Sequence, residues 1–172
     1  MHSTIYLLRH GIAEDPRPEL DDEERHLTPA GKRKMARAAQ GLKRLGVKPD
    51  LVLSSPLHRA METATIAARA LMPNRPVQVY TPLAPGHSPE QVVRGLKEFA
   101  TARRIFLVGH EPSMSELFSY LLTGSSGLVS VAFKKGAMAA IHVAGVPPRN
   151  GGTLGWFMTS KQQRAAARRP AS

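Results

Sequence analysis

The sequence predicts a single-domain α/β protein, a three-layer sandwich in which helices cover both faces of a mostly parallel central sheet and the C-terminal strands are antiparallel. Over the first 124 residues, short apolar runs alternate with segments of helical periodicity, as in successive strand–helix units. From residue 128 onward, apolar side chains recur at every second position in residues 129–133, 139–143 and 153–158, which indicates antiparallel strands. At 172 residues with 42% hydrophobic content, the chain is long enough to bury one sizeable core.

The parallel part of the sheet is expected to contain four strands. They are predicted at residues 6–9, 51–53, 77–80 and 105–108. The last of these runs is apolar throughout, which is typical of a strand covered on both faces. The helices between the strands begin with side chains suited to N-caps, namely Thr28 before Pro29, Ser55, Ser88 in a capping box, and Ser113.

The net charge of +11 is unevenly distributed. Seven of the 13 acidic residues lie between Glu14 and Glu24, in an aperiodic segment with two prolines that is expected to be a surface loop. Cations concentrate on a helix around residues 32–44 and in residues 161–172. These last residues form a basic tail after a domain spanning residues 1–160, and we expect the tail to be poorly ordered or at most a final helical turn. Aromatic residues make up only 5% of the chain, so a surface for stacking nucleobases is not indicated and we expect no nucleic-acid partner.

The composition also bears on location and partners. No apolar run approaches the length of a membrane span, and no basic region followed by an apolar stretch opens the chain, so we expect neither a membrane partner nor secretion. The absence of cysteine removes disulfides and thiolate metal sites, although it leaves the redox compartment open. A cytoplasmic location is the expectation. A monomer is favoured, with the oligomeric state left open.

Four charged or ionisable side chains follow three of the expected strands. Arg9 and His10 come at the end of the first strand, Arg59 follows the second, and His110 follows the strand at 105–108. Because the carboxyl ends of parallel strands meet at one edge of a sheet, we expect these groups to lie together. Two guanidiniums and two imidazoles with no acid fixed among them describe a pocket for a dianion. A metal site is the rival interpretation, but adjacent arginines repel a cation, so we expect neither a metal nor another cofactor.

Three blocks of sequence carry a resemblance to a known family. They are Leu8-Arg9-His10-Gly11, Ser54-Ser55-Pro56 with Arg59 and Glu62-Thr63-Ala64, and Gly109-His110. In this order and at these spacings, the blocks resemble the histidine phosphatase superfamily, the phosphoglycerate-mutase-like enzymes. Within it, the small size and two further segments resemble the SixA-type phosphohistidine phosphatases: Arg25-His26-Leu27-Thr28-Pro29-Ala30-Gly31 and Val108-Gly109-His110-Glu111-Pro112.

The resemblance implies roles for the candidate residues. His10 would be the nucleophile, which takes up a phosphoryl group before water releases it as phosphate. Arg9, Arg59 and His110 would be catalytic groups that hold the phosphoryl oxygens, and Arg25 would join them in binding phosphate. The implied activity is metal-independent hydrolysis of phosphohistidine, with a phosphorylated protein or a small phosphorylated molecule as the substrate.

The sequence departs from the superfamily pattern at the general acid. Members that act on phosphate esters typically carry a glutamate shortly after a leucine in the loop that follows the third strand, whereas no carboxylate lies between Leu83 and Glu90 here. Glu90, Glu111 and Glu116 have simpler explanations as helix-start or turn residues, which leaves His87 as the candidate proton donor. Two other functions therefore stay open: a general phosphomonoesterase of the same superfamily, and a catalytically weak module that binds phosphorylated partners.

Overall fold

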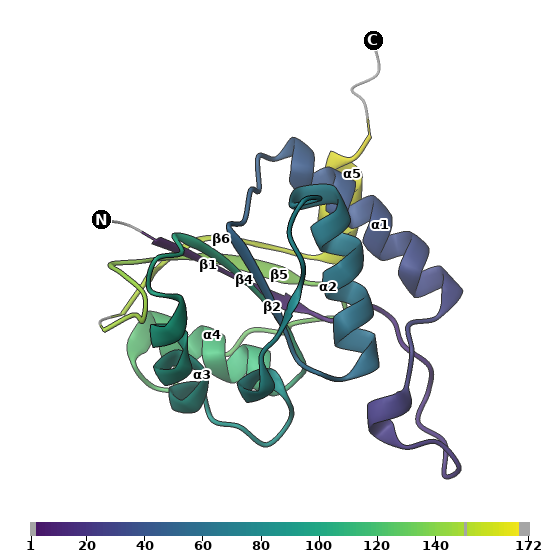
Figure 1. Ribbon diagram of the computed structural model, residues 1–172, viewed down its shortest axis with the longest axis horizontal. Coiled ribbons are helices and arrows are strands. Elements are labelled where there is room, and N and C mark those ends of the chain that lie inside the picture. Colours follow the sequence, from purple (N-terminus) through teal and green to yellow (C-terminus); the bar gives the residue numbers. More distant parts are fainter. Residues whose placement is uncertain (1–2, 150, 169–172) are drawn as a thin grey trace.

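The structure is a computed structural model that describes residues 3–149 and 151–168. A six-stranded mixed sheet runs through its centre in the order β3-β2-β4-β1-β5-β6 (Figure 1). The first four strands are parallel, β5 pairs antiparallel with β1, and β6 pairs antiparallel with β5. The strands are β1 (Ser3–Arg9), β2 (Leu51–Ser54), β3 (Gln78–Val79), β4 (Arg104–Gly109), β5 (Met138–Val143) and β6 (Thr153–Met158).

Helices cover both faces of this sheet, so the predicted three-layer α/β fold is confirmed (Figure 1). Tyr6 and Leu8 of β1 pack in a core with α1 and α2, whereas Ile5 and Leu7 pack in a second core with α3 and α4. No helix in the described part of the chain is long and apolar enough to cross a membrane. The helices are α1 (Pro29–Arg44), α2 (His58–Leu71), α3 (Pro89–Gly95), α4 (Ser113–Thr123) and α5 (Ser160–Ala166), and short 3-10 helices span Asp22–Glu24, Thr81–Leu83 and Leu96–Phe99.

The register of the central strands brings their carboxyl ends together. β4 lies between β1 and β2 and pairs with both in parallel. Arg9 at the end of β1 lies opposite Gly109, and Ser54 at the end of β2 lies opposite Val108. The three strands therefore end at one edge of the sheet, as the positions of the candidate residues require.

The strand predicted at residues 129–133 does not form, although its neighbours β5 and β6 do. Side chains of α4 take the backbone groups that a strand would offer to the sheet. The Ser119 hydroxyl accepts the N–H groups of Leu128 and Val129, and the Ser115 hydroxyl donates to the Val131 carbonyl oxygen. The alternation of this segment therefore reflects its packing against α4.

Two of the four predicted N-caps are confirmed. Thr28 caps α1, and Ser88 caps α3 in a capping box. By contrast, α2 has Leu57 as its N-cap and no side-chain cap. The Ser55 hydroxyl accepts the Leu57 N–H at 3.3 Å and also contacts a candidate site residue. Ser113 is the first residue of α4, which has no side-chain cap.

The tail that was expected to be poorly ordered begins with helix α5 (Figure 1). Gln163 in this helix is fully buried, and its side-chain amide donates to the carbonyl oxygens of Gly136 at 2.9 Å and Met158 at 3.2 Å. α5 approaches α1 closely at Gly41, where a Cβ atom would overlap the Gln163 carbonyl oxygen. Residues 161–166 therefore belong to the packed fold. They are held by polar contacts that the amino-acid composition does not reveal. Residues 169–172 lie outside the described residues.

Replacing Gly41 with alanine should lower the free energy of unfolding by about 1–3 kcal/mol, because the added methyl group would push against the backbone of α5. Urea denaturation measures the change. Gly127→Ala is the matched control, since nothing lies within 4 Å of a Cβ atom at that position. Equal stability of the two variants would show that α5 is not held against α1.

Candidate active site

His10 follows the last residue of β1 and is buried, with 5% of its surface exposed. Its backbone N–H donates to the Gly109 carbonyl oxygen at 3.0 Å, which ties it to the end of β4. The ring Nδ1 lies 2.7 Å from the carbonyl oxygen of Gly11. Because a carbonyl oxygen can only accept, Nδ1 carries the proton of the neutral ring and Nε2 keeps its lone pair.

The loop after His10 is held from two sides. The Gly11 N–H donates to Thr63 Oγ1 of α2 at 3.0 Å, and that hydroxyl donates to the Arg59 carbonyl oxygen at 2.7 Å. A Cβ atom at position 11 would lie 2.7 Å from Met35 Cγ, so α1 leaves little room for a side chain there. Both helices on this face therefore fix the peptide that orients His10.

His110 occupies the corresponding place at the end of β4. Its ring centroid lies 5.2 Å from that of His10, with the ring planes tilted by 53°. Its Nε2 lies 2.8 Å from the hydroxyl of Ser55, which follows β2. Side chains that follow three neighbouring strands thus meet in one cluster.

Both imidazoles are held in the neutral form. Burial lowers the pKa of His10 to about 3, and the positive charges of His110, when protonated, and of Arg59 and Arg9 act in the same direction. Burial also lowers the pKa of His110 to about 4, with Arg59 the strongest contributor among the nearby charges. Near neutral pH, the cluster therefore contains two neutral rings beside fixed guanidinium charges.

Arg9 and Arg59 supply these charges. Arg9 lies at the end of β1 and donates from Nη1 to the Phe133 carbonyl oxygen at 2.7 Å, while Arg59 lies in the first turn of α2 with 4% of its surface exposed. The Nε atoms of both arginines, like Nδ1 of His110, are buried without a hydrogen-bond partner among the described residues. A buried polar atom without a partner costs about 1–3 kcal/mol. Three of them in one cluster indicate hydrogen-bonding capacity that a ligand can use.

The cluster also contains an acid, so the expectation of a pocket with no acid among its cations is wrong. The carboxylate of Asp22 bridges two guanidiniums, with Oδ2 2.7 Å from Arg59 Nη2 and Oδ1 2.6 Å from Arg25 Nη1. Its backbone carbonyl oxygen also accepts from Arg59 Nη1. Burial alone would raise the pKa of Asp22, but its hydrogen bonds with Arg25 and Arg59 bring it below the usual value. Asp22 lies in an aperiodic loop, and the path of such a loop cannot be read from periodicity.

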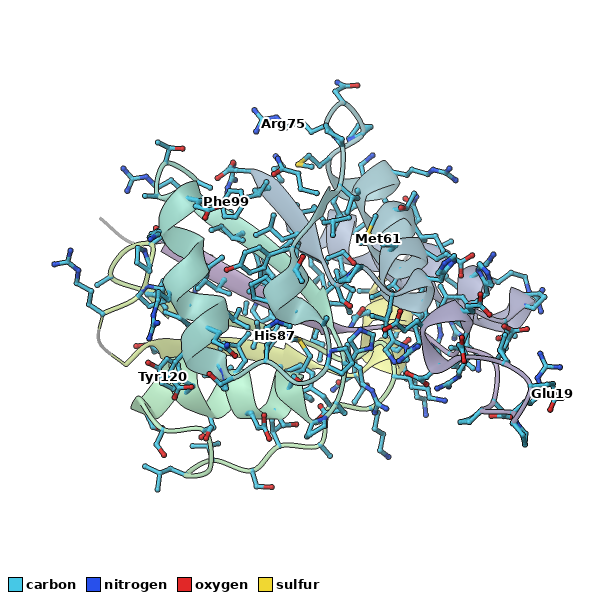
Figure 2. The ribbon with its side chains drawn as sticks, turned by 60° about the horizontal axis from the view of Figure 1, so that its bottom comes forward. Glu19, Met61, Arg75, His87, Phe99 and Tyr120 are labelled. Carbon is cyan, nitrogen blue, oxygen red and sulfur yellow. The ribbon has the colours of Figure 1, made fainter. Side chains whose placement is uncertain are left out.

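The two remaining candidates differ in their surroundings. Arg25 is buried, joins the cluster through Asp22, and donates from Nε to the Glu14 carbonyl oxygen at 2.8 Å. His87 is half-buried in the loop between β3 and α3, with Nδ1 3.1 Å from the Ala84 carbonyl oxygen (Figure 2). The contacts thus place Arg25 in the cluster, whereas the hydrogen bond of His87 lies within its own loop.

Glu62 is a supporting residue whose contacts the sequence did not reveal. Its carboxylate accepts the Leu27 N–H at 2.7 Å, pairs with Lys32 at 2.7 Å, and lies 3.2 Å from His26 Nδ1. Glu62 therefore ties the residues that follow the acidic loop (residues 14–24) to α2. The only signal in the sequence was the place of Glu62 in the block Glu62-Thr63-Ala64.

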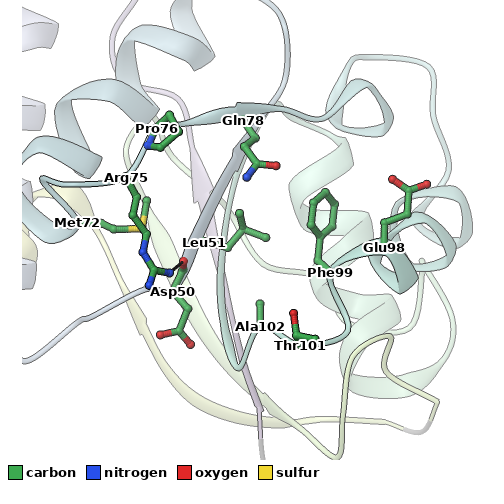
Figure 3. Close-up of a pocket in the computed structure, with 10 residues that line it drawn as sticks. All are labelled: Asp50, Leu51, Met72, Arg75, Pro76, Gln78, Glu98, Phe99, Thr101 and Ala102. Atoms are coloured by element: carbon green, nitrogen blue, oxygen red, sulfur yellow. Dashed lines mark hydrogen bonds between the residues drawn. The ribbon is translucent and has the colours of Figure 1, made fainter.

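Among residues 3–149 and 151–168, no group of three or more His, Cys, Asp or Glu side chains is placed to hold a metal ion. A cavity of about 480 Å³ lies at the amino ends of β2 and β4 (Figure 3). Its lining includes Asp50, Arg75 and Phe99, and Asp50 pairs with Arg104 at 2.7 Å. The histidines and arginines lie at the opposite, carboxyl ends of these strands, so this cavity is separate from the candidate site.

The low pKa of His10 makes stability depend on pH. The ring takes up a proton near pH 6.5 in the unfolded chain but only near pH 3 in the folded protein. Between these values the unfolded state binds more protons, so the free energy of unfolding falls as the pH falls. His10→Asn should abolish about 2 kcal/mol of the loss that the wild type shows between pH 7.5 and pH 5 in urea denaturation.

His142→Asn is the control for this measurement, because His142 is an exposed residue of β5. If stability falls as steeply in His10→Asn as in His142→Asn, then folding does not hold His10 in its neutral form.

Comparisons with known proteins identify the family of the chain. A family model described as the histidine phosphatase superfamily (branch 1) matches residues 5–84, which include Arg9, His10 and Arg59. Over 125 residues the chain is 36% identical to an uncharacterised protein of Picosynechococcus sp., and this alignment covers 72% of the chain and 75% of the relative.

Solved structures share the fold. The protein histidine phosphatase SixA, solved in complex with tungstate, superposes with a TM-score of 0.79 at 23% identity, covering 92% of this chain and 98% of that one. A mycobacterial glucosyl-3-phosphoglycerate phosphatase superposes with a TM-score of 0.65 at 16% identity, covering 90% and 98%. The sequence matches and the shared fold together show that the chain belongs to the histidine phosphatase superfamily.

Proposed function

We propose that this protein is a cytoplasmic phosphatase that hydrolyses phosphohistidine through a phosphorylated His10, without a metal or another cofactor. The observation that carries the proposal is the tautomer of His10. The Gly11 carbonyl oxygen holds the ring proton on Nδ1 and leaves Nε2 as a nucleophile beside buried arginines. A module that only binds phosphate needs cations but has no need of an imidazole held in this way. The structural likeness to SixA, whose name states that it acts on phosphohistidine in proteins, supports the same substrate class.

The reaction has two displacements at phosphorus. In the first, Nε2 of His10 attacks the phosphorus atom and the P–N bond of the substrate breaks. The bonding electrons stay with the departing ring, which is protonated on its other nitrogen and leaves as neutral imidazole. In the second, water attacks phosphorus and the bond to Nε2 breaks. The bonding electrons return to Nε2, which regenerates neutral His10, and dihydrogen phosphate leaves with both protons of the water molecule.

The cationic groups act on the phosphoryl oxygens in both steps. Arg9, Arg59 and His110 would hold them, because each of these residues has a buried polar atom with no partner among the described residues. Arg25 would bind the phosphate from the side of the acidic loop. The low pKa of His10 keeps the nucleophile unprotonated before the substrate arrives.

Asp22 is the group that the phosphoryl oxygens would replace. Its carboxylate takes hydrogen bonds from Arg25 and Arg59, which a bound phosphate would need. Phosphate and Asp22 therefore compete, and the acidic loop must move when an anion binds.

Asp22→Asn should strengthen inhibition by inorganic phosphate about tenfold, because a neutral amide competes less well for two guanidiniums. The inhibition constant measures the effect. Glu23→Gln is the control, since Glu23 is an exposed residue of the same 3-10 helix. Weaker inhibition in Asp22→Asn would mean that Asp22 positions the arginines for phosphate and does not compete with it.

A second candidate function is a general phosphomonoesterase, and the observation that favours it is Glu111. Burial raises the pKa of this carboxyl group, while the hydrogen bond from Ser115 and the charge of Arg9 oppose the rise. Glu111 follows His110 directly in a turn, is half-buried, and its carboxylate accepts from the Ser115 hydroxyl at 2.8 Å. A carboxyl group whose pKa is raised holds a proton more strongly than a free one, and next to His110 it could protonate an alcohol leaving group.

A leaving-group series separates the two functions. The value of kcat/KM should fall by about 100-fold or more from a phosphohistidine peptide through aryl phosphates to an alkyl phosphate, because general acid catalysis contributes roughly 100- to 10,000-fold and neutral imidazole leaves without it. His10→Ala is the blank. In the wild type, quenching without acid should trap phosphate on His10.

Three results would contradict parts of the proposal. A flat series would favour the phosphomonoesterase, and Glu111→Gln compared with His87→Gln would then identify the proton donor. Phosphate trapped on another histidine would exclude His10 as the nucleophile. Activity that a chelator abolishes and a divalent ion restores would exclude a metal-independent reaction.

A further inference from the structure

A basic groove lies beside Gly11, on the face of the sheet covered by α1 and α5. A hollow of about 220 Å³ is lined by Gly11 and Met35 together with five cations, and a hollow of about 290 Å³ shares two of these cations and adds two more. We call these two hollows together the basic groove. The seven cations of the groove are Lys34, Arg37, Lys134, Lys135, Lys161, Arg164 and Arg168.

The charge of the basic groove is not neutralised within the described part of the protein. No acidic residue lines either hollow, and none of the seven cations takes part in an ion pair among the described residues. Cations gathered from α1, from the turn at residues 134–136 and from α5 repel one another. An anionic ligand would remove this repulsion.

The basic groove is connected to the candidate active site through the backbone. The N–H of Gly136 lies 3.2 Å from the carbonyl oxygen of Arg9 and 3.1 Å from that of His10. The carbonyl oxygen of Gly136 in turn accepts from the buried amide of Gln163 in α5. The turn that carries two of the lysines is therefore fixed between the end of β1 and α5. Gly11, whose carbonyl oxygen contacts the His10 ring, also lines the groove.

We propose that the basic groove binds a carboxylate-rich segment of the protein whose phosphohistidine enters the active site. The inference rests on the proposed function and narrows its substrate to an acidic phosphoprotein. From Lys161 to Ala166 helix α5 advances about 7.5 Å, which matches about two residues of an extended peptide. Four of the seven cations are lysines, which suit flexible carboxylates, and no aromatic residue lines the groove to stack nucleobases.

Two phosphohistidine peptides test the proposal, one with a run of Asp and Glu on either side of the phosphohistidine and one with Ser and Gln at the same positions. The wild type should hydrolyse the acidic peptide with a kcat/KM about tenfold higher at low ionic strength. About 0.5 M salt should remove this advantage, because it screens exposed charges. Phosphoimidazole, which has no flanking residues, reports on the active site alone.

The double variant Lys34→Glu/Lys161→Glu should lose the preference for the acidic peptide and keep its activity on phosphoimidazole. Both lysines are exposed and lie outside the proposed catalytic groups. The matched control is Arg69→Glu/Lys97→Glu, which makes the same change in net charge at exposed positions that do not line the groove. The control should keep the preference.

Several outcomes would overturn the inference. Equal hydrolysis of the two peptides by the wild type would refute it. Loss of the preference in the control as complete as in the groove variant would make the effect one of net charge. Tighter binding of a single-stranded oligonucleotide to the same lysines would replace the acidic protein with a nucleic acid. A salt-sensitive dimer in sedimentation, lost in the groove variant, would make the acidic loop of a second copy the occupant.

The failure of the proposed function can be told apart from the failure of this inference. If no phosphohistidine substrate is hydrolysed, the proposed function is wrong. Fluorescence anisotropy of a labelled, unphosphorylated acidic peptide still tests the groove in that case. Binding that the groove variant weakens about tenfold and the control variant retains would support the inference, and equal binding by all three proteins would refute it.

Discussion

The hydrogen bond from Nδ1 of His10 to the Gly11 carbonyl oxygen is the contact on which the candidate site depends. One proton on Nδ1 decides that Nε2 is the basic nitrogen. The peptide that fixes this proton is itself fixed, because Thr63 accepts its neighbouring N–H and Met35 leaves little space for a side chain at Gly11. Strand β1 and helices α1 and α2 thus together fix the orientation of the His10 ring.

Much of the fold could be predicted because periodicity reports on burial. Alternating strands and helices gave the central sheet, and the order of the units implied that Arg9, His10, Arg59 and His110 would meet at one edge. The segment at 129–133 misled because two-residue alternation does not distinguish pairing with a sheet from packing on a helix. Helix α5 was predicted only as one of two alternatives, a final helical turn or disorder, because composition does not reveal the polar contacts of Gln163 that help to hold it.

The charges of the site could be predicted only in part. Types of residue at strand ends indicated an anion pocket, but the carboxylate that occupies its arginines comes from a loop whose path has no periodic signal. Asp22 offsets part of the charge of the buried guanidiniums, and the two imidazoles stay neutral, so the protein avoids an uncompensated cluster of five positive charges.

The contacts of Gly136 affect when the site can fold during synthesis of the chain. They join the carbonyl oxygens of Arg9 and His10 to Gln163, which follows more than 150 residues later in the chain. β1 likewise can pair only after β4 and β5, the strands that flank it in the sheet, have been made. Such distant pairings form late, after the intervening chain has left the ribosome. The surroundings of His10 are therefore completed only after residues more than 150 positions further along the chain have been made.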